Sequence, residues 1–550
     1  MNVLRVENLY VEVGTTEKTT KAVRGVSFSL SEGETFAIVG ESGSGKSMLC
    51  KSIMHLLPKS GQITDGSIWL MDEDITHLKE KEMCAYRGSQ FAMVFQDPMT
   101  SLDPTFTIGK QIAEAVLLHN PKMERDELRE RVIWLMELVG IENAKERMQL
   151  YPYNLSGGMR QRCVLAIALA SNPKILIADE PTTALDVTIQ AQILSLLKEI
   201  QKKLHTAIIF VSHDLAVVAQ IADCVAIMHE GKIVETGEVR EVFQNPQDPY
   251  TRHLLNDRPS AMAKHSDHVH EEKKGHSHAH EHGYAHEDMG DHLLEVRGLT
   301  HIFPLTKRSY VKAVDDVSFA LHRGEILGIV GESGSGKSTL ARCIMNIYPS
   351  SAGEIVFDGV HTENRMDYRK HRQILQTRRQ MIFQDSYSSL DPRMKVVDVI
   401  TEPLRIHRVK PKRGSYREEA AYQLKFVGLE EEFLDKYPPE LSGGQRQRVA
   451  IARALTMEPD LLIADEAVAS LDVTTQAGII QLFKHLREEH GISILFIAHD
   501  LMLVKSICDR VGVMKQGKMV ELAATQELFT CPQHEYTKEL LAAVPQIDKK

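Results

Sequence analysis

A domain-sized internal repeat constrains this chain more than any other feature of its sequence. The eight-residue segment Gly40–Ser47 recurs letter for letter as Gly331–Ser338. The motif Leu155-Ser-Gly-Gly returns at Leu441, so corresponding motifs lie 286 to 291 residues apart. The two copies therefore keep one order of elements and differ in short loops. A chain of 550 residues also exceeds the usual size of one hydrophobic core, so we expect two tandem domains.

The segment between the copies has a different composition. Residues 256–292 are polar, poor in large apolar side chains, and rich in His, Glu, Asp and Lys. Such a segment buries too little apolar surface to offset the entropy lost on ordering, so we interpret it as a flexible linker. This places the first domain at residues 1–255 and the second at residues 293–550.

The overall composition excludes several classes of protein. With 43% hydrophobic and 25% charged residues, the chain has the composition of an ordinary globular protein. It has no run of apolar residues long enough to span a bilayer, and its start lacks the apolar core of a secretory signal. Its seven cysteines are scattered, which favours reduced thiols in a cytosolic compartment. A net charge of -10 argues against a nucleic-acid partner.

Short apolar runs alternate with segments of helical periodicity in both copies, which predicts an α/β fold with a parallel sheet covered on both faces. Two of the runs end at the repeated Gly-rich segment, and four more read as buried strands. The predicted strands are Thr35–Val39, Lys174–Ala178, Ala207–Val211, Glu325–Val330, Leu461–Ala464 and Ile492–Ile497. The predicted helices include Ile189–Lys203 and Gln476–Glu489.

The repeated segment has the pattern Gly-x-x-x-x-Gly-Lys-Ser. Its glycines allow a tight turn whose N–H groups point at phosphate oxygens, and the next helix adds positive charge. A Gly/Ser-rich surface loop is the alternative, but the strand before and the helix after each copy favour phosphate binding. We expect the lysines to reach the terminal phosphates and Ser47 and Ser338 to bind Mg²⁺. The expected contacts are Gly40, Ser42, Gly43, Ser44, Gly45, Lys46, Ser47, Gly331, Ser333, Gly334, Ser335, Gly336, Lys337, Ser338 and Thr339.

An acidic pair ends a buried strand in each copy, as Asp179-Glu180 and Asp465-Glu466. The aspartates are expected to hold the Mg²⁺ water shell and the glutamates to polarise the attacking water. Such acids can also simply cap the following element, but the phosphate-binding loops favour the catalytic interpretation.

A third motif, Leu-Ser-Gly-Gly-x-Arg-Gln-Arg, predicts a second anion-binding helix N-terminus in each copy. An ordinary Ser N-cap is the alternative. Its key residues are Ser156, Gly157, Gly158, Ser442, Gly443 and Gly444.

Together with Ser212-His213-Asp214 and Ala498-His499-Asp500, these motifs resemble the nucleotide-binding domains of ATP-binding cassette proteins, over nearly the whole chain outside the linker. The resemblance implies two P-loop domains of the RecA-like type, each with an N-terminal antiparallel β portion. It also implies a helical subdomain at residues 108–151 and 396–437, where a helical decoration without a docking role is the alternative. Each ATP would lie between the Gly-rich loop of one domain and the Ser-Gly-Gly helix of the other.

The resemblance also assigns roles to single residues. It implies that Gln96 and Gln384 contact Mg²⁺ and sense the membrane partner, and that His213 and His499 hold the γ-phosphate. Phe303 is the candidate for stacking on adenine in the second copy.

The first copy has Val13 at the position matching Phe303, with Tyr10 close by, so its adenine contact stays open. Both copies keep every reacting group, which predicts two hydrolytically competent sites. The second copy departs at Ala467, where the first has Pro181, but this change removes no reacting group.

Two further segments narrow the branch of the family. Phe95–Pro104 and Phe383–Pro392 resemble the Gln loops of oligopeptide, dipeptide and nickel importers, and Asn245–Arg252 and Pro532–Thr537 resemble their C-terminal signature. The cysteine cluster of some relatives is missing after this signature, so we expect no iron–sulfur cluster.

The resemblance implies an ATPase for peptide import at the cytoplasmic face of the membrane. Two permease subunits and, indirectly, an extracytoplasmic binding protein would be its partners. Import of nickel, cobalt or a metal chelate is the closest alternative. A soluble tandem-cassette ATPase acting on ribosomes, a DNA-repair ATPase and an exporter fit the importer-like segments less well.

The linker carries alternating histidines that are candidates for binding a transition metal, namely His276, His278, His280 and His282. A solvated spacer that happens to be His-rich is the alternative. If the linker binds metal, calorimetric titration of the isolated linker with Ni²⁺ at neutral pH will show heat at micromolar metal, because neutral imidazoles ligate Ni²⁺. The absence of heat would leave only the spacer.

Overall fold

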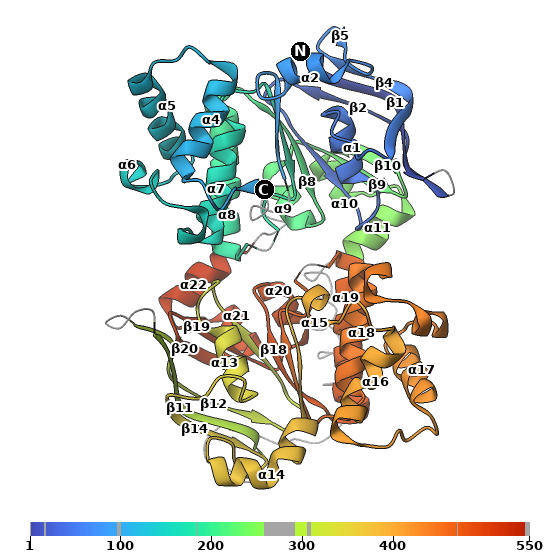
Figure 1. Cartoon of the computed structure of the whole chain (residues 1–550), viewed down its shortest axis with the longest axis vertical. Coiled ribbons are helices and arrows are strands. Elements are labelled where there is room, and N and C mark those ends of the chain that lie inside the picture. The colour runs from blue at the N-terminus through green and yellow to red at the C-terminus, as the bar shows by residue number, and fades with distance from the viewer. Residues whose placement is uncertain are drawn as a thin grey trace. The chain divides into compact units, whose positions relative to one another are not determined.

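The computed structural model describes residues 2–15, 18–95, 101–183, 185–257, 292–304, 310–469 and 471–544. The chain divides into two compact units that meet after Asn256 (Figure 1). Among the described residues, the first unit ends at Asn256 and the second runs from Asp257 to Val544.

A six-stranded sheet forms the centre of the first unit, in the order β10-β9-β3-β8-β7-β6. Only β10 runs antiparallel to its neighbour. Every residue of β3, β7 and β8 is buried, as expected for strands covered by helices on both faces. The strands are β3 (Thr35–Val39), β6 (Phe91–Val94), β7 (Ile175–Asp179), β8 (Ala207–Ser212), β9 (Cys224–His229) and β10 (Lys232–Glu238).

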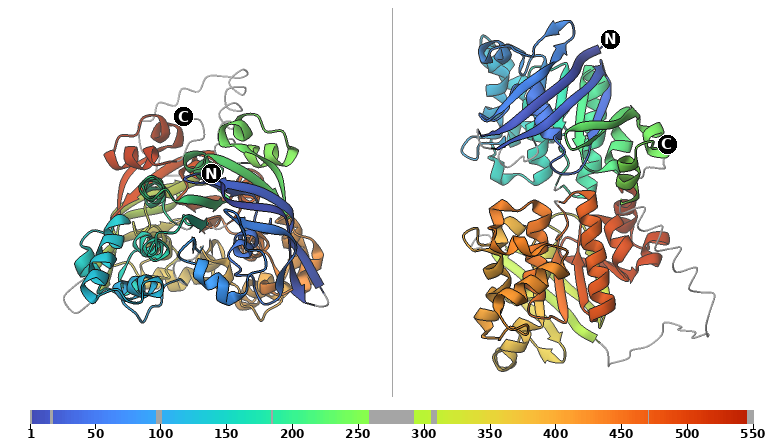
Figure 2. Two further views of the ribbon diagram at one scale, coloured as in Figure 1. Left: turned by 90° about the horizontal axis from the view of Figure 1, so that it is seen from above. Right: turned by 90° about the vertical axis from the view of Figure 1, so that its right-hand side faces the viewer.

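A smaller antiparallel sheet of order β2-β1-β4-β5 packs with helix α1 against one face of this sheet through a shared apolar core. Figure 2 shows its two long strands as twisted dark-blue ribbons. The strands are β1 (Asn2–Thr15), β2 (Lys18–Ser31), β4 (Gly61–Leu70) and β5 (Glu73–Asp74).

The helices of the first unit cover its sheets and form a separate helical subdomain. Helices α4, α5 and α6 group together beside α7 (Figure 1), and their buried apolar side chains continue into the core on the other sheet face. The helices are α1 (Lys46–Ile53), α2 (Glu80–Tyr86), α4 (Ile108–His119), α5 (Arg125–Leu138), α6 (Ala144–Arg147), α7 (Gly157–Ala168), α8 (Val187–Leu204), α9 (Leu215–Ile221), α10 (Val239–Gln244) and α11 (Pro249–Asn256), with a 3₁₀ turn at Pro152–Asn154.

The second unit repeats this plan, with a six-stranded sheet of order β16-β17-β18-β13-β19-β20 and a four-stranded sheet of order β12-β11-β14-β15. The strands are β11 (His292–Pro304), β12 (Tyr310–His322), β13 (Ile326–Val330), β14 (Ala352–Phe357), β15 (Val360–His361), β16 (Arg379–Ile382), β17 (Leu461–Asp465), β18 (Ser493–Ile497), β19 (Arg510–Lys515) and β20 (Lys518–Ala524).

The helices of the second unit occupy corresponding positions, and α16, α17 and α18 pack together as its helical subdomain. They are α13 (Lys337–Ile344), α14 (Arg365–Thr377), α15 (Ser386–Ser389), α16 (Val396–His407), α17 (Tyr416–Phe426), α18 (Gly443–Leu455), α19 (Val473–His490), α20 (Leu501–Ile507), α21 (Thr525–Thr530) and α22 (Glu535–Ala542), with 3₁₀ turns at Glu431–Asp435 and Pro438–Glu440.

These elements confirm the predicted α/β class, its antiparallel β portions and its helical subdomains. The six predicted strands are β3, β7, β8, β13, β17 and β18, with ends that differ by one residue at most. The two predicted helices, α8 and α19, begin two or three residues earlier than predicted because Asp186 and Asp472 cap them, and each ends one residue later. Residues 258–291 of the linker, including the histidines proposed to bind metal, lie outside the described residues, so the predictions about them stand as predictions. Asn256 ends α11 and His292 begins β11.

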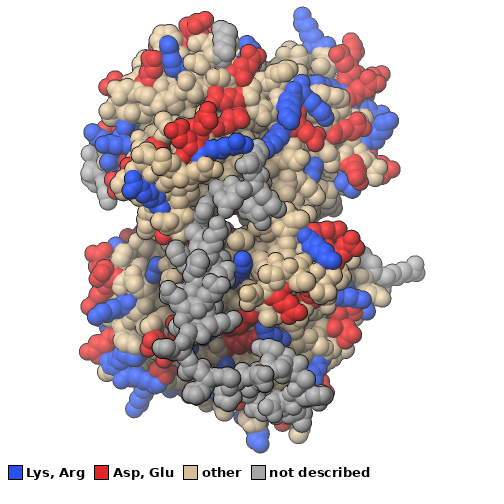
Figure 3. All heavy atoms as spheres, turned by 180° about the vertical axis from the view of Figure 1, so that it is seen from behind, with Lys and Arg blue, Asp and Glu red and all other residues tan. Residues whose placement is uncertain are grey.

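The surface carries charges of both signs. Figure 3 shows acidic and basic side chains interspersed over the displayed face of each unit, so neither sign dominates there. Among the described residues, no helix combines the length and apolar character needed to cross a bilayer.

Burial of the central sheet leads to a testable prediction about the stability of the first unit. Phe210 in β8 is fully buried, so Phe210→Ala should lower the unfolding free energy of the first unit by about 3–5 kcal/mol. Phe106→Ala, at a side chain that is 51% exposed, serves as the control and should change it by no more than about 0.5 kcal/mol. Urea unfolding, followed by hydrogen exchange of the β8 amides, measures the unfolding free energy of each variant. A loss at Phe210 no larger than that of the control would contradict this core.

Candidate functional site

The repeated Gly-rich loop joins the end of β3 to α1 in the first unit and the end of β13 to α13 in the second. Gly45 and Gly336 precede these helices with φ of 103° and 104°, in the region that favours glycine. A Cβ at Gly45 would lie 2.2 Å from the Ala22 carbonyl oxygen, and one at Gly336 would lie 2.1 Å from that of Ala313. Both the conformation and the space therefore require glycine here.

The loop curls around a buried lysine side chain in each unit. Lys46 Nζ donates to the carbonyl oxygens of Gly40 and Glu41, both at 2.7 Å. In the second unit Lys337 Nζ donates to Gly331 O at 2.7 Å and to the next carbonyl at 2.9 Å. Because a buried ammonium is costly without oxygen partners, these bonds fix where the charge sits. The ammonium is thereby held inside the loop, against its first two carbonyl oxygens.

The hydroxyl that follows each lysine meets the first acid of the acidic pair. Ser47 Oγ donates to Asp179 Oδ1 at 3.1 Å, and Ser338 Oγ donates to Asp465 Oδ1 at 2.8 Å. Burial raises the pKa of both aspartates above the ordinary value, although the serine hydroxyls oppose the rise. The Oδ2 atom of Asp465 is buried without a hydrogen-bond partner among the described residues. An oxygen set of this kind suits a hard divalent cation.

The second acid of the pair adopts an unusual backbone conformation. Glu180 and Glu466 have φ of 49° and 48°, the left-handed region that glutamate rarely adopts. Such strain persists where the surrounding structure enforces it, typically at functional sites. The backbone N–H of Glu180 donates a hydrogen bond to Val211 O, and the N–H of Glu466 donates one to Ile497 O.

The predicted histidine and glutamine residues surround these carboxylates. His213 Nδ1 lies 3.3 Å from Glu180 Oε1, and His499 Nδ1 lies 3.8 Å from Glu466 Oε2. Gln384 Nε2 donates to Glu466 Oε2 at 2.6 Å. The position of Gln96 falls outside the described residues.

Burial and charge act in opposite directions at each of these pairs. Burial raises the pKa of Glu180, but the hydrogen bond and charge of His213 outweigh it and hold the pKa below the ordinary value. Burial lowers the pKa of His213, and the Glu180 carboxylate outweighs it and raises that pKa. Glu466 and His499 behave in the same way. Each pair is therefore biased toward a carboxylate beside an imidazolium.

The Ser-Gly-Gly motifs begin helices α7 and α18, and their serines act as N-caps. Ser156 accepts a hydrogen bond from Met159 N, and Ser442 accepts one from Gln445 N. The two glycines of each motif have different surroundings. A Cβ at Gly158 would lie 2.6 Å from Ile189 on α8, whereas one at Gly157 would meet nothing closer than 3.9 Å.

The second unit shows the same contrast. A Cβ at Gly444 would lie 2.5 Å from Thr475, while one at Gly443 would lie 3.9 Å from its nearest neighbour, Leu471. The second glycine of each motif is thus required by packing within its own unit, and the first leaves the helix N-terminus open to a ligand.

Phe303 packs in an aromatic group near the end of β11. Its ring lies edge-on to His301 and to Tyr348, with centroid distances of 4.5 Å and 5.4 Å. Sequence reasoning missed Thr183, whose hydroxyl donates to Glu180 Oε2 at 3.0 Å, and it also missed contacts of Tyr250 and Tyr536 described below. The spacing Glu-x-x-Thr after the strand was the available signal for Thr183.

Comparison with known proteins agrees with this geometry. The family model described as ABC transporter matches residues 23–183 and 314–469, more than half of the chain. A second model, described as the C-terminal region of oligopeptide/dipeptide transporters, matches residues 234–283 and 520–550.

Full-length relatives show the same family. The glutathione import ATP-binding protein GsiA of Escherichia coli O157:H7 and that of strain K12 are each 45% identical to this chain, over 99% of it and 90% of the relative. The same protein of Shigella flexneri is 45% identical over equal shares. With its two phosphate loops, acidic pairs and Ser-Gly-Gly helices, the chain belongs to the ABC transporter family, as an ATP-hydrolysing subunit of an importer of the oligopeptide/dipeptide type.

Proposed function

We propose that this chain hydrolyses two molecules of ATP per cycle to drive the uptake of small peptides through a membrane permease of two subunits. It acts from the cytoplasmic face of the membrane. The observation that carries the proposal is the position of Gln384, which lines a surface groove and also bonds the acid Glu466. The Gln384 side chain thereby connects the groove where we propose that a partner docks with the carboxylate that we assign to hydrolysis.

Each ATP is proposed to lie between the phosphate loop of one unit and the Ser-Gly-Gly helix of the other. The open glycines Gly157 and Gly443 support this, because nothing in their own unit crowds them. Lys46 and Lys337 would neutralise the terminal phosphates, and bound nucleotide would hold the units together. Phe303 would contact the adenine in one of the two sites.

A Mg²⁺ ion fits the oxygen sets of Ser47 with Asp179 and of Ser338 with Asp465. When bound, it would neutralise negative charge that develops on the transferred phosphoryl group. The orphaned Oδ2 of Asp465 supports this assignment, since a buried carboxylate oxygen without a partner is costly.

Hydrolysis would use the second acid of each pair. Glu180 and Glu466 remain ionised beside His213 and His499, so each can accept a hydrogen bond from an attacking water. The histidine, biased toward its charged form, can donate to a γ-phosphate oxygen. Thr183 fixes the rotamer of Glu180, and Gln384 holds Glu466.

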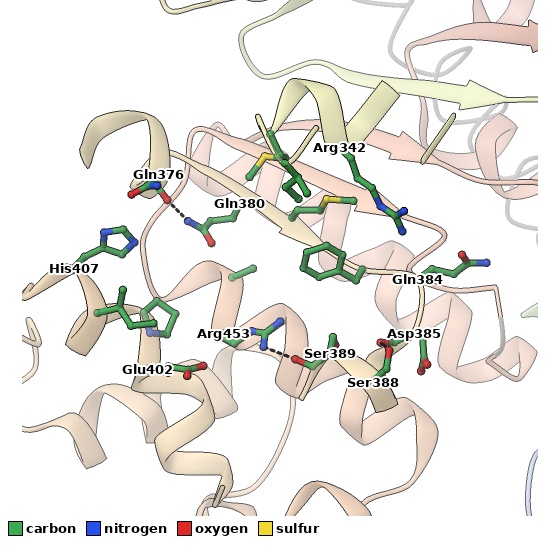
Figure 4. A pocket seen from close by; sticks show the side chains of 17 residues that line it. Arg342, Gln376, Gln380, Gln384, Asp385, Ser388, Ser389, Glu402, His407 and Arg453 are labelled. Carbon is green, nitrogen blue, oxygen red and sulfur yellow. Dashed lines mark hydrogen bonds between the residues drawn. The ribbon is translucent and has the colours of Figure 1, made fainter. Parts of the chain in front are cut away.

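The groove in the second unit lies between the sheet and the helical subdomain and has a volume of about 650 Å³ (Figure 4). Its walls come from α13, α14, β16, α15, α16 and α18. Apolar side chains line it together with Arg342, Glu402 and Arg453. Ile347 and Ile406, which also line it, are 49% and 67% exposed. A cavity with an apolar rim and a few fixed charges suits an amphipathic helix of a partner.

The cargo is assigned from the relatives, which are named for glutathione import. Glutathione is a tripeptide, so we place di- to oligopeptides of this size first. The His-rich linker favours a metal or metal chelate as the second candidate. Uptake of labelled glutathione, a dipeptide and ⁶³Ni²⁺ by vesicles containing the complete transporter distinguishes them. ATP-dependent uptake of Ni²⁺ alone would overturn the peptide assignment.

Removing both hydrolytic acids provides the first test. Glu180→Gln combined with Glu466→Gln should lower ATP turnover by about 10²- to 10⁴-fold, the range lost with a general base. ATP binding should persist because the phosphate-binding lysines are intact, so the nucleotide-bound, closed form should accumulate. Phosphate release and equilibrium nucleotide binding measure the two effects.

The matched control changes the same charges on exposed helix surfaces, as Glu199→Gln with Glu489→Gln, and should hydrolyse ATP normally. Normal turnover in the active-site variant as well would mean that these acids do not position the water.

The rim of the groove provides the second test. Ile406→Glu should prevent co-purification of the permease and stop uptake, because a charge would have to be buried at the docking surface. ATP binding by the isolated chain should not change. Ile374→Glu is the control, since Ile374 is 45% exposed on α14 and does not line the groove. Equal co-purification of both variants would remove the groove from the docking surface.

A further inference from the structure

The C-terminal signature of each half has no role in the function proposed so far. It comprises Asn245–Arg252 in the first unit and Pro532–Thr537 in the second, inside the segments that match the oligopeptide/dipeptide transporter C-terminal region. In both units it follows a short helix after the edge strand, β10 or β20, and runs into the last helix, α11 or α22.

A glutamate on the edge strand anchors this segment in both units. Glu235 on β10 accepts from Gln247 N at 2.8 Å and from Asp248 N at 3.1 Å. Glu521 on β20 accepts from Gln533 N at 2.8 Å and from the N–H of the following residue at 3.0 Å. Partial burial opposes ionisation of these glutamates, but the backbone donors outweigh it and lower the pKa of both. Each carboxylate therefore pins the start of the final helix to the sheet.

The tyrosine of the signature then reaches the phosphate loop. The Tyr536 hydroxyl accepts from Glu332 N at 3.1 Å, and the Tyr250 hydroxyl accepts from Glu41 N at 3.4 Å. Glu41 and Glu332 directly follow the first glycine of each loop. Their carbonyl oxygens are those that accept from the buried lysine. One residue of the phosphate loop is thus held through its N–H by the C-terminal helix and through its carbonyl by the lysine.

The surroundings of the two tyrosine rings differ between the units. The ring of Tyr250 lies against His229, with centroids 3.9 Å apart, whereas Lys515 Nζ lies 4.2 Å from the ring centre of Tyr536. The residue before each tyrosine also differs, being a proline in the first unit and a glutamate in the second. The hydroxyl-to-amide contact recurs although the packing around it has changed. Ring packing alone would not retain the hydroxyl in both places.

We propose that Tyr250 and Tyr536 are positioning residues for the phosphate loop, and that they link the C-terminal region of each half to its nucleotide site. The hydroxyl fixes the peptide group that joins the first glycine of the loop to the glutamate, and the glycine carbonyl of that same group also accepts from the lysine, so the hydroxyl sets the entrance of the loop. The last helix becomes part of the nucleotide-binding apparatus without touching the nucleotide. Its displacement would loosen the loop.

The test removes the hydroxyls and keeps the rings, in the full chain carrying Tyr250→Phe and Tyr536→Phe. Loss of one such hydrogen bond per site should weaken binding of Mg²⁺-ATP about fivefold. Hydrogen exchange of residues 331–336 and 40–45 without nucleotide should accelerate. The thermal midpoint should change little because the rings stay packed. Tyr422→Phe, on α17 in the helical subdomain, is the control and should change none of these.

A second pair of variants removes the anchor and leaves the tyrosines, as Glu235→Gln with Glu521→Gln. A smaller change in the same direction is expected, because an amide accepts the backbone donors less strongly than a carboxylate does. Unchanged affinity and unchanged exchange in the phosphate loop of the Tyr→Phe variant would overturn the proposal. Should that variant not fold, unchanged affinity and exchange in the Glu→Gln variant would overturn it instead. No permease or cargo is needed, so a negative result leaves the proposed import function intact.

Discussion

A buried ammonium group determines the geometry of each half. Lys46 and Lys337 are only 5% and 4% exposed, and a charge so deeply placed is tolerated only where oxygen atoms surround it. The loop must therefore turn its first two carbonyls inward onto the lysine. That shape brings the backbone so close to the neighbouring strand that Gly45 and Gly336 admit no side chain. The serine–aspartate contacts and the tyrosine contacts depend on a loop held in this way.

The sequence predicts the fold well wherever one local pattern is sufficient. Buried strands such as β3 appear as unbroken apolar runs, and the phosphate loop carries its own motif. Contacts between segments that are distant in the sequence produce no local pattern from which they could be predicted. Glu41 and Tyr250 are 209 residues apart, and no local sequence pattern at either residue predicts the hydrogen bond between the Glu41 N–H and the Tyr250 hydroxyl. The left-handed backbone conformation of Glu180 could not be predicted either, because glutamate rarely adopts a positive φ and no local pattern indicates it. The roles of Gln96 and of the linker histidines remain predictions, since those residues lie outside the described structure.

The two halves share their phosphate chemistry but differ where a base is expected. In the second unit Phe303, His301 and Tyr348 form an aromatic group, and Arg342 lies over the Tyr348 ring. The matching positions of the first unit are aliphatic or lysine, among them Val13. Lysine and serine contacts, which do not read the base, are the same in both halves. If Phe303 contacts adenine as proposed, selectivity for the base would reside mainly in the second half, while the acidic pairs and histidines proposed for hydrolysis recur in both halves.

In the proposed function, coupling between a docked helix and hydrolysis would depend on the placement of one carboxylate, that of Glu466. The backbone of Glu466 is fixed in its strained conformation by its hydrogen bond to β18, so its side chain is the part that can respond. That side chain has polar neighbours on two different segments. His499 follows β18, which lies between β17 and β13 inside the sheet, whereas Gln384 follows the edge strand β16 on the loop that lines the groove. If a partner helix docks in the groove as proposed, a shift of this loop would alter the Gln384 contact before the His499 contact. The carboxylate would then be turned toward a water or away from it.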